Sequence, residues 1–198
     1  MLTGIREKGL SVLNWTSAAQ QLRLRLQCAA QWLPEEAWPA VDDATLLDEL
    51  ETWLLPHMTG VHSLRGLKSV DIYQALRDRL PWSLQQRLES SLPTHYTVPT
   101  GSQIAIRYDE DNPPALAVRM QEMFGEASTP TIAQGRVALV LELLSPAQRP
   151  LQITRDLSAF WAGSYREVQK EMKGRYPKHV WPDDPANTAP TRRTKKYS

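Results

Sequence analysis

The sequence predicts an α+β fold: an N-terminal helical array followed by a small, mainly antiparallel sheet with a long C-terminal helix packed on it. Changes in apolar spacing carry this prediction. Apolar residues recur every three or four positions up to Leu92, alternate every second position from Pro93, and return to helical spacing after Asp156. We therefore expect a helical subdomain over residues 1–92, a sheet-plus-helix subdomain over 93–182 and a disordered basic tail over 183–198.

The first half predicts five helices, most of which have a polar residue near the start and a proline after the end. Their expected ranges are 3–10, 14–33 with Asn14 as cap, 42–54 with Asp42 or Asp43 as cap, 69–80 from Ser69, and 83–92 with a capping box at Ser83. In the second helix, Leu24, Cys28 and Trp32 form an additional apolar stripe. This stripe either meets another helix of the chain or is covered by a part of the protein outside this sequence.

Strands begin after Pro93. Residues 94–98 and 103–108 are predicted to form a hairpin, because Pro99-Thr100-Gly101-Ser102 has the proline and glycine placement of a tight turn. Further strands are expected at 116–120, 136–144 and 151–153, with a helical turn at 121–124 and a loop at 126–135. The 136–144 strand has apolar residues on both faces, which predicts a central place in the sheet.

The last predicted element is a helix from Asp156 to Met172 with an apolar and aromatic stripe, ended by Gly174. Residues 175–182 cannot continue this helix, because two prolines hold them extended and leave basic and aromatic side chains alternating. After Asp184 no apolar period remains, which predicts disorder.

Composition excludes several classes of protein. A chain of 198 residues with 41% hydrophobic and 23% charged residues is typical of a globular protein, and no apolar run approaches the roughly 20 residues needed to cross a bilayer. We expect no membrane partner. The single cysteine, Cys28, forms no internal disulfide and fits a reducing compartment, so we expect a cytoplasmic location.

No catalytic or metal site is predicted. The four histidines are scattered, and Asp109-Glu110-Asp111-Asn112 lacks the glycine and distal glutamate of a calcium loop. Gly163-Ser164 lacks the second glycine of a nucleophile elbow. We expect this chain alone to catalyse nothing and to hold no cofactor, with an unrecognised hydrolase as the weakest alternative.

Charge is concentrated near the C-terminus. Residues 154–198 hold ten Lys and Arg against five Asp and Glu, whereas the remainder holds thirteen against seventeen. This asymmetry indicates either an anionic partner or a solvated tail. The candidate nucleic-acid-binding residues are Arg155, Arg166, Lys170, Lys173, Arg175, Tyr176, Lys178, His179 and Trp181, with Arg192, Arg193, Lys195 and Lys196 as further phosphate contacts. Trp181 either stacks on bases or anchors the extended segment.

The run FW-x-x-SY-x-x-V-x-K-x-x-x-GRYPKH-x-WP-x-DP, from Phe160 to Pro185, resembles the C-terminal signature of HrpB, a family of bacterial DEAH-box ATP-dependent helicases. The segments at 66–102, 121–125 and 141–157 fit the same region. The sequence has no G-x-x-x-x-G-K-[ST] loop and no Asp-Glu-Ala-His box. The resemblance therefore implies the segment after the helicase motor, with ATP and Mg²⁺ bound elsewhere in the parent polypeptide.

Two roles follow from this resemblance. In the first, the basic segment contacts single-stranded nucleic acid, with RNA as the expected kind, although the residues themselves do not separate RNA from DNA. In the second, the chain braces the helicase core of the same polypeptide through the Leu24, Cys28 and Trp32 stripe or through residues 176–182, without binding nucleic acid directly.

Overall fold

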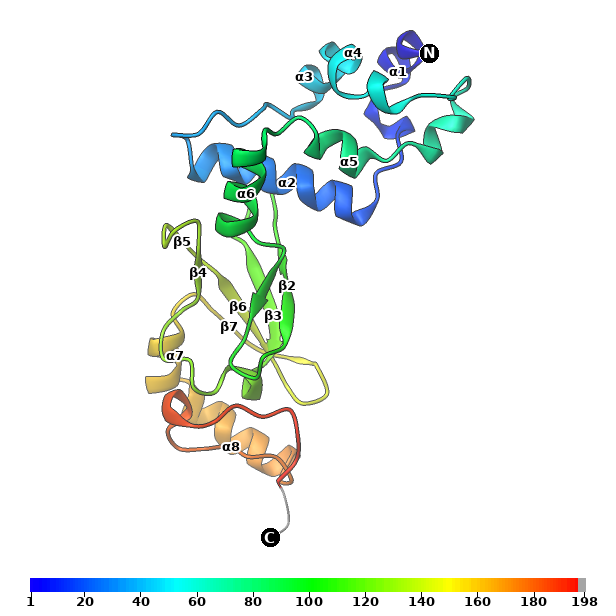
Figure 1. The fold of residues 1–198 in the computed structure, drawn as a ribbon. Helices are drawn as coiled ribbons and strands as arrows, with labels where there is room; N and C mark the ends of the chain where they lie inside the picture. The colour runs from blue at the N-terminus through cyan, green and yellow to red at the C-terminus, as the bar shows by residue number, and fades with distance from the viewer. Residues whose placement is uncertain (196–198) are drawn as a thin grey trace. The chain divides into compact units, whose positions relative to one another are not determined.

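The structure is a computed structural model that describes residues 1–195, and it confirms the α+β class (Figure 1). Helices come first and a mainly antiparallel sheet follows. The chain forms two compact units: unit 1 runs from Met1 to Leu92, and unit 2 begins at Pro93.

Unit 1 consists of helices and short 3-10 turns (η). Its elements are α1 (Leu2–Lys8), η1 (Leu10–Val12), α2 (Ser17–Trp32), α3 (Asp43–Asp48), α4 (Leu50–Trp53), η2 (Leu55–His57), η3 (Arg65–Ser69), α5 (Ile72–Arg77) and α6 (Trp82–Ser91). The long helix α2 packs against α5 and α6, and Cys28 is buried. The part of the additional stripe that Cys28 occupies is therefore covered within the unit.

Helix starts were only partly predicted. Asp42 caps α3 as expected, with its carboxylate accepting a hydrogen bond from the Thr45 N–H at 3.1 Å. The cap of α2 is Thr16, not Asn14, whose side chain donates to a distant carbonyl instead. The predicted capping box at Ser83 does not form, because α6 already begins at Trp82.

A buried arginine joins α2 to the end of α6. The Arg25 side chain is 1% exposed, its Nε donates to the Leu92 carbonyl at 2.8 Å, and its guanidinium lies 3.2 Å from the Glu89 carboxylate. Leu92 follows the last turn of α6, where carbonyls lack partners within the helix. Arg25 therefore supplies a donor that this helix end needs.

Unit 2 holds the sheet and the last helices. Its elements are β1 (His95–Thr97), β2 (Gln103–Arg107), β3 (Ala115–Arg119), η4 (Met120–Met123), β4 (Thr131–Ile132), β5 (Val137–Ala138), β6 (Val140–Leu144), β7 (Pro150–Thr154), α7 (Leu157–Ala162), α8 (Tyr165–Arg175) and η5 (Pro185–Asn187). The main sheet has the strand order β1-β2-β3-β6-β7. All its pairs are antiparallel except β3 with β6.

The sheet agrees with its prediction in most places. β1 and β2 form the expected hairpin, and β6 is central because it pairs with β3 on one side and β7 on the other. The predicted 136–144 strand is interrupted at Leu139, and its first part pairs with β4 inside the expected loop. Ala133, Gln134 and Gly135 all have positive φ, which reverses the chain between β4 and β5.

The predicted C-terminal helix is split in two. α7 ends at Ala162 and α8 begins at Tyr165 and continues through Gly174. At Gly163, between the helices, a Cβ atom would lie 3.2 Å from the Ala159 carbonyl oxygen, so the absence of a side chain lets the chain turn there. Figure 1 shows α8 beyond one end of the strands and not across them.

The expectation of disorder over 183–198 is wrong for residues 183–195. Pro185 is buried in η5, its carbonyl accepts from the Gly125 N–H at 2.9 Å, and the Thr191 N–H donates to the Gln121 carbonyl at 3.2 Å. Backbone hydrogen bonds hold this segment in place. Because they do not depend on side-chain type, the order of the segment cannot be recognised from an apolar pattern in the sequence. The remaining expectation, for residues 196–198, lies outside the described residues.

We predict that Arg25→Ala lowers the free energy of unfolding by about 3 kcal/mol, because it leaves a buried carbonyl without a donor and removes a packed side chain. Urea denaturation followed by circular dichroism measures this change. The control is Glu89→Gln, at a side chain that is 46% exposed, which should cost less than about 1 kcal/mol. Equal losses for the two variants would contradict the assignment.

Candidate nucleic-acid interface

The strap, residues 176–183, is pinned to unit 2 by Trp181. The indole is 5% exposed and its Nε1 donates to the Tyr176 carbonyl at 2.9 Å. A buried ring cannot stack on a base, so Trp181 is an anchor and leaves the set of candidate base contacts.

The inner face of α8 holds the other side of the strap. The Gln169 Nε2 lies 3.0 Å from both the Trp181 and Pro182 carbonyls and 2.8 Å from the Asp183 carboxylate. The Tyr165 hydroxyl donates to the Pro182 carbonyl at 2.6 Å. Burial raises the pKa of Tyr165, and the nearby Asp183 charge raises it further. The strap is therefore fixed by buried polar groups as well as by its tryptophan.

Three predicted cations share the outer face of α8. Arg166, Lys170 and Lys173 follow at spacings of four and three residues, are exposed, and form no ion pair with a described residue. Arg175 differs, because its guanidinium lies 3.3 Å from the Glu171 carboxylate. Both partners of that pair are more than half exposed, so the pair adds little stability.

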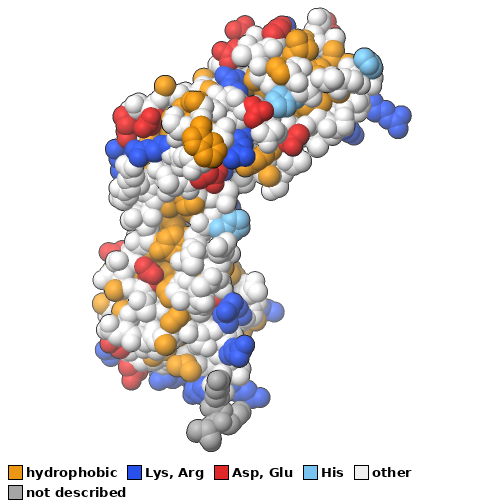
Figure 2. All heavy atoms as spheres, viewed as in Figure 1, with side chains coloured by type: hydrophobic (Ala, Val, Ile, Leu, Met, Phe, Trp, Pro, Cys, Tyr) orange, Lys and Arg blue, Asp and Glu red, His pale blue; other side chains and the backbone are white. Residues whose placement is uncertain are grey.

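Beyond α8, the C-terminal segment returns to the strap and brings more cations to it. The Lys195 N–H donates to the Lys178 carbonyl at 2.6 Å, and an Arg192 guanidinium nitrogen donates to the Ser102 hydroxyl at 3.1 Å. We use the name basic surface for Arg119, Lys178, Arg192, Arg193 and Lys195. Figure 2 shows Lys and Arg side chains over the end of unit 2 that carries α8, with some acidic side chains on its flank.

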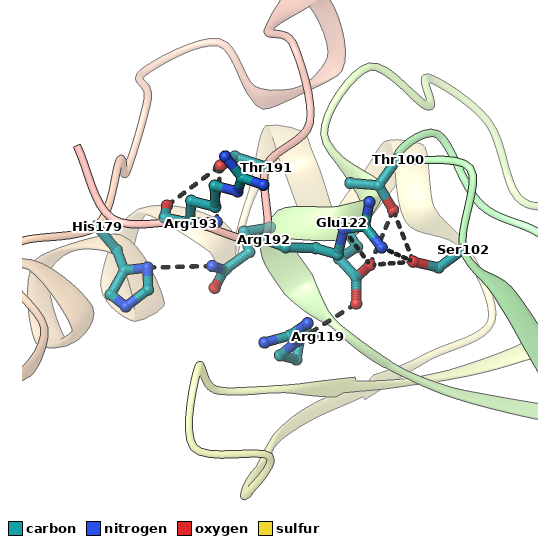
Figure 3. A network of polar contacts seen from close by, with 9 residues as sticks. Thr100, Ser102, Arg119, Glu122, His179, Thr191, Arg192 and Arg193 are labelled. Carbon is teal, nitrogen blue, oxygen red and sulfur yellow. Dashed lines mark hydrogen bonds and ion pairs between the residues drawn. The ribbon is translucent and has the colours of Figure 1, made fainter. Parts of the chain in front are cut away.

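A buried carboxylate lies under the basic surface (Figure 3). Glu122 is 5% exposed, and its Oε1 accepts from the Thr100 and Ser102 hydroxyls, both at 2.8 Å. The Arg119 Nε lies 3.3 Å from Oε2, and the Arg192 Nε lies 4.0 Å from Oε1. Two guanidinium groups and two hydroxyls thus compensate one buried negative charge.

His179 lies between these cations. Partial burial lowers the pKa of its imidazole, and the positive charge of Arg119 lowers it further. A hydrogen bond with the Arg193 backbone acts in the opposite direction and raises the pKa. Its Nδ1 is 3.1 Å from the Gln121 Nε2, and its ring meets Tyr176 edge-on with centroids 6.3 Å apart. The neutral imidazole is therefore the form that the folded unit favours.

The structure thus brings together some of the predicted residues and separates others. Lys178 belongs to the basic surface, His179 lies next to Arg119 and Arg193, and the three α8 cations lie on the helix that precedes the strap. Arg155 lies apart, before α7, where its carbonyl accepts from the Thr129 hydroxyl at 3.4 Å. Sequence reasoning missed Arg119 and Glu122, since the end of a strand carries no local signal for such a role.

In residues 1–195, no helix combines the length and hydropathy that a bilayer crossing requires. No three His, Cys, Asp or Glu side chains of the described chain come together as the ligands of a metal ion would.

Comparison with known proteins gives one consistent result. A family model described as the C-terminal region of ATP-dependent helicases matches residues 53–185. Over 198 residues the chain is 85% identical to the ATP-dependent RNA helicase HrpB of Escherichia coli (strain K12), covering 100% of this chain and 24% of that protein.

Two crystal structures are similar as well. One, of the E. coli DExH-box NTPase HrpB, matches 98% of this chain with a TM-score of 0.95 and 84% identity. The other, of the E. coli DEAH/RHA helicase HrpB, matches 91% of this chain with a TM-score of 0.81 and 82% identity. The chain covers 24% and 23% of those two chains, so it spans about a quarter of the length of its relatives.

We predict that Trp181→Ala lowers the free energy of unfolding by about 3 kcal/mol or more, because it empties a buried aromatic site and releases the strap. Urea denaturation gives the change, and faster hydrogen exchange over residues 176–183 locates it. The control is Trp82→Ala, at a tryptophan that is 70% exposed, where less than about 0.5 kcal/mol is expected. A stable Trp181→Ala protein with a protected strap would show that the indole is no anchor.

His179 should make stability fall in acid. Its folded pKa lies below the unfolded value, so its contribution is present above the unfolded pKa, about 6.5, and is lost as pH falls through the folded pKa. The free energy of unfolding should therefore drop less between about pH 7 and 5 in His179→Gln than in the wild type. His62→Gln, at an exposed position in unit 1, is the control. An unchanged pH profile in His179→Gln would refute this.

Proposed function

Because this chain belongs to the ATP-dependent helicase C-terminal family, we propose that it is a non-catalytic accessory region of such a helicase and contacts single-stranded nucleic acid. The basic surface makes the contact, continued by Arg166, Lys170 and Lys173 on α8. The observation that carries this proposal is the convergence of cations from the end of β3, the strap and the C-terminal segment.

The charge of the basic surface supports an anionic ligand. Among the described residues, Lys178, Arg193 and Lys195 have no carboxylate partner, and Glu122 beneath them is nearly inaccessible to solvent. Its negative charge is already compensated by Arg119 and Arg192. The five cations of the basic surface therefore outnumber this one acid, as attraction of a phosphate backbone requires.

Aromatic contacts play a smaller part than basic ones. Tyr176 and His179 are partly exposed at the edge of the basic surface, so either ring can meet an unpaired base. Trp181 contributes indirectly, because it holds the strap that carries Lys178. A few stacking positions next to the basic surface suit single strands, whose bases are available.

The remaining parts of the proposal concern the parent protein. The helicase core of the same polypeptide is the partner in cis, and it binds the ATP and Mg²⁺ for which this sequence has no phosphate loop. A cytoplasmic location goes with this role.

The bracing role is the second candidate, and exposed apolar side chains favour it. Trp82 on α6 is 70% exposed and Leu55 in η2 is 48% exposed, both in unit 1. Each is a large apolar group that another part of the same polypeptide could cover. The strap itself is unavailable for such a contact through Trp181, which is already buried.

We predict that Lys178→Glu/Arg193→Glu weakens binding of a fluorescein-labelled oligouridine by at least about tenfold at about 50 mM salt. The slope of log affinity against log salt should shrink by about 1.4, which corresponds to two lost phosphate contacts on a single strand. Fluorescence anisotropy titrations at about 50 and about 200 mM salt give both quantities.

The matched control is Arg65→Glu/Lys68→Glu. It makes the same change in net charge at exposed positions of unit 1. This control should bind as the wild type does. If the wild type shows no binding at the lower salt concentration, the bracing role stands in place of nucleic-acid contact.

A further inference from the structure

A small polar pocket opens beside the basic surface, where the β1–β2 turn meets the C-terminal segment. Its volume is about 350 Å³, within the range of ligand pockets of about 300–1,000 Å³. The lining residues are Pro99, Thr100, Pro190, Thr191, Arg192 and Arg193. Two arginines, two threonines and two prolines therefore line one space.

Glu122 fixes the direction of the hydroxyl groups at this pocket. Its Oε1 is 2.8 Å from both the Thr100 Oγ1 and the Ser102 Oγ. An ionised carboxylate has no proton to give, so both hydroxyls must donate to it. The Ser102 oxygen also accepts from Arg192, which uses part of its remaining capacity.

Thr100 is left with an unused acceptor. Its single proton is directed at Glu122, and the Ser102 hydroxyl 3.4 Å away has its own proton directed at the same carboxylate. This oxygen can therefore accept a proton from water or from a ligand that displaces it, while Arg192 and Arg193 beside it can only donate. A ligand that complements these groups therefore carries a hydroxyl or amine close to an anionic group.

A ribose 2′-hydroxyl next to a backbone phosphate provides both the hydrogen-bond donor and the anionic group. Resting on the nucleic-acid contact proposed above, we infer that this pocket binds a ribose-phosphate unit and that Thr100 determines specificity by accepting a hydrogen bond from the 2′-hydroxyl. The guanidinium groups of Arg192 and Arg193 meet the phosphate, and Pro99 and Pro190 pack against the sugar. Deoxyribose lacks the donor, so the contact favours RNA over DNA.

The inference is tested first with ligands, so that no variant needs to fold. Oligouridine, oligodeoxyuridine and 2′-O-methyl-oligouridine of equal length share their base and differ only at the 2′ position. Oligouridine should bind the wild-type chain about fivefold more tightly than either of the others, the effect of one ordinary hydrogen bond. The methylated oligomer keeps the 2′ oxygen but cannot donate, so it separates donation from sugar shape.

Variants then assign the effect to Thr100. Thr100→Val should abolish the preference for oligouridine over oligodeoxyuridine, and circular dichroism shows that the variant is folded. Thr100→Ser keeps the hydroxyl and should keep the preference. Thr131→Val, at an exposed threonine of β4, is the control and should change neither affinity.

The outcomes separate the two proposals. Equal, salt-sensitive binding of the three oligomers overturns the reading by Thr100 and leaves the nucleic-acid contact intact, provided Lys178→Glu/Arg193→Glu still loses binding. A preference for oligouridine that persists in Thr100→Val also overturns the assignment. Absence of binding to all three oligomers overturns both proposals.

Discussion

The carboxylate of Glu122 is the constraint on which the basic end of unit 2 depends. A charge with so little access to water is costly unless it is paired and hydrogen-bonded. Its partners come from the β1–β2 turn, the end of β3 and the C-terminal segment. Compensation of one acid therefore joins three distant parts of the chain, and it draws two arginines to the place where other cations gather.

A second set of buried polar contacts keeps the strap in place. Gln169 and Tyr165 on α8 bind its carbonyls, and Trp181 fills the space beneath it. These contacts explain how residues rich in proline and charge can be ordered without an amphipathic pattern. They also distinguish two roles that the sequence alone does not separate: Trp181 anchors the strap, while Lys178 on the same strap is exposed to solvent.

Local signals in the sequence predicted the hairpin at Pro99 to Ser102, the Asp42 cap and the central place of β6, because turn residues and apolar alternation act over a few positions. These signals failed where contacts between residues far apart in the sequence determine the structure. The break at Gly163 lies within an unbroken helical pattern, and residues 183–195 are ordered by bonds to η4 and the residues after it. Several of the proposed site residues lie on α8 and the strap, where the sequence pattern expects them, whereas Arg119 and Glu122 join them only through tertiary contacts.

Ser102 and Arg192 are 90 residues apart, so their hydrogen bond can form only after most of unit 2 has been synthesised. Unit 1 is complete at Leu92 and is able to fold while later residues are still being added. The β3–β6 pairing must wait for a crossover of some twenty residues, and the arginine of the last segment arrives later still. While the chain is being synthesised next to ribosomal RNA, which is itself a polyanion, the basic surface is therefore still incomplete.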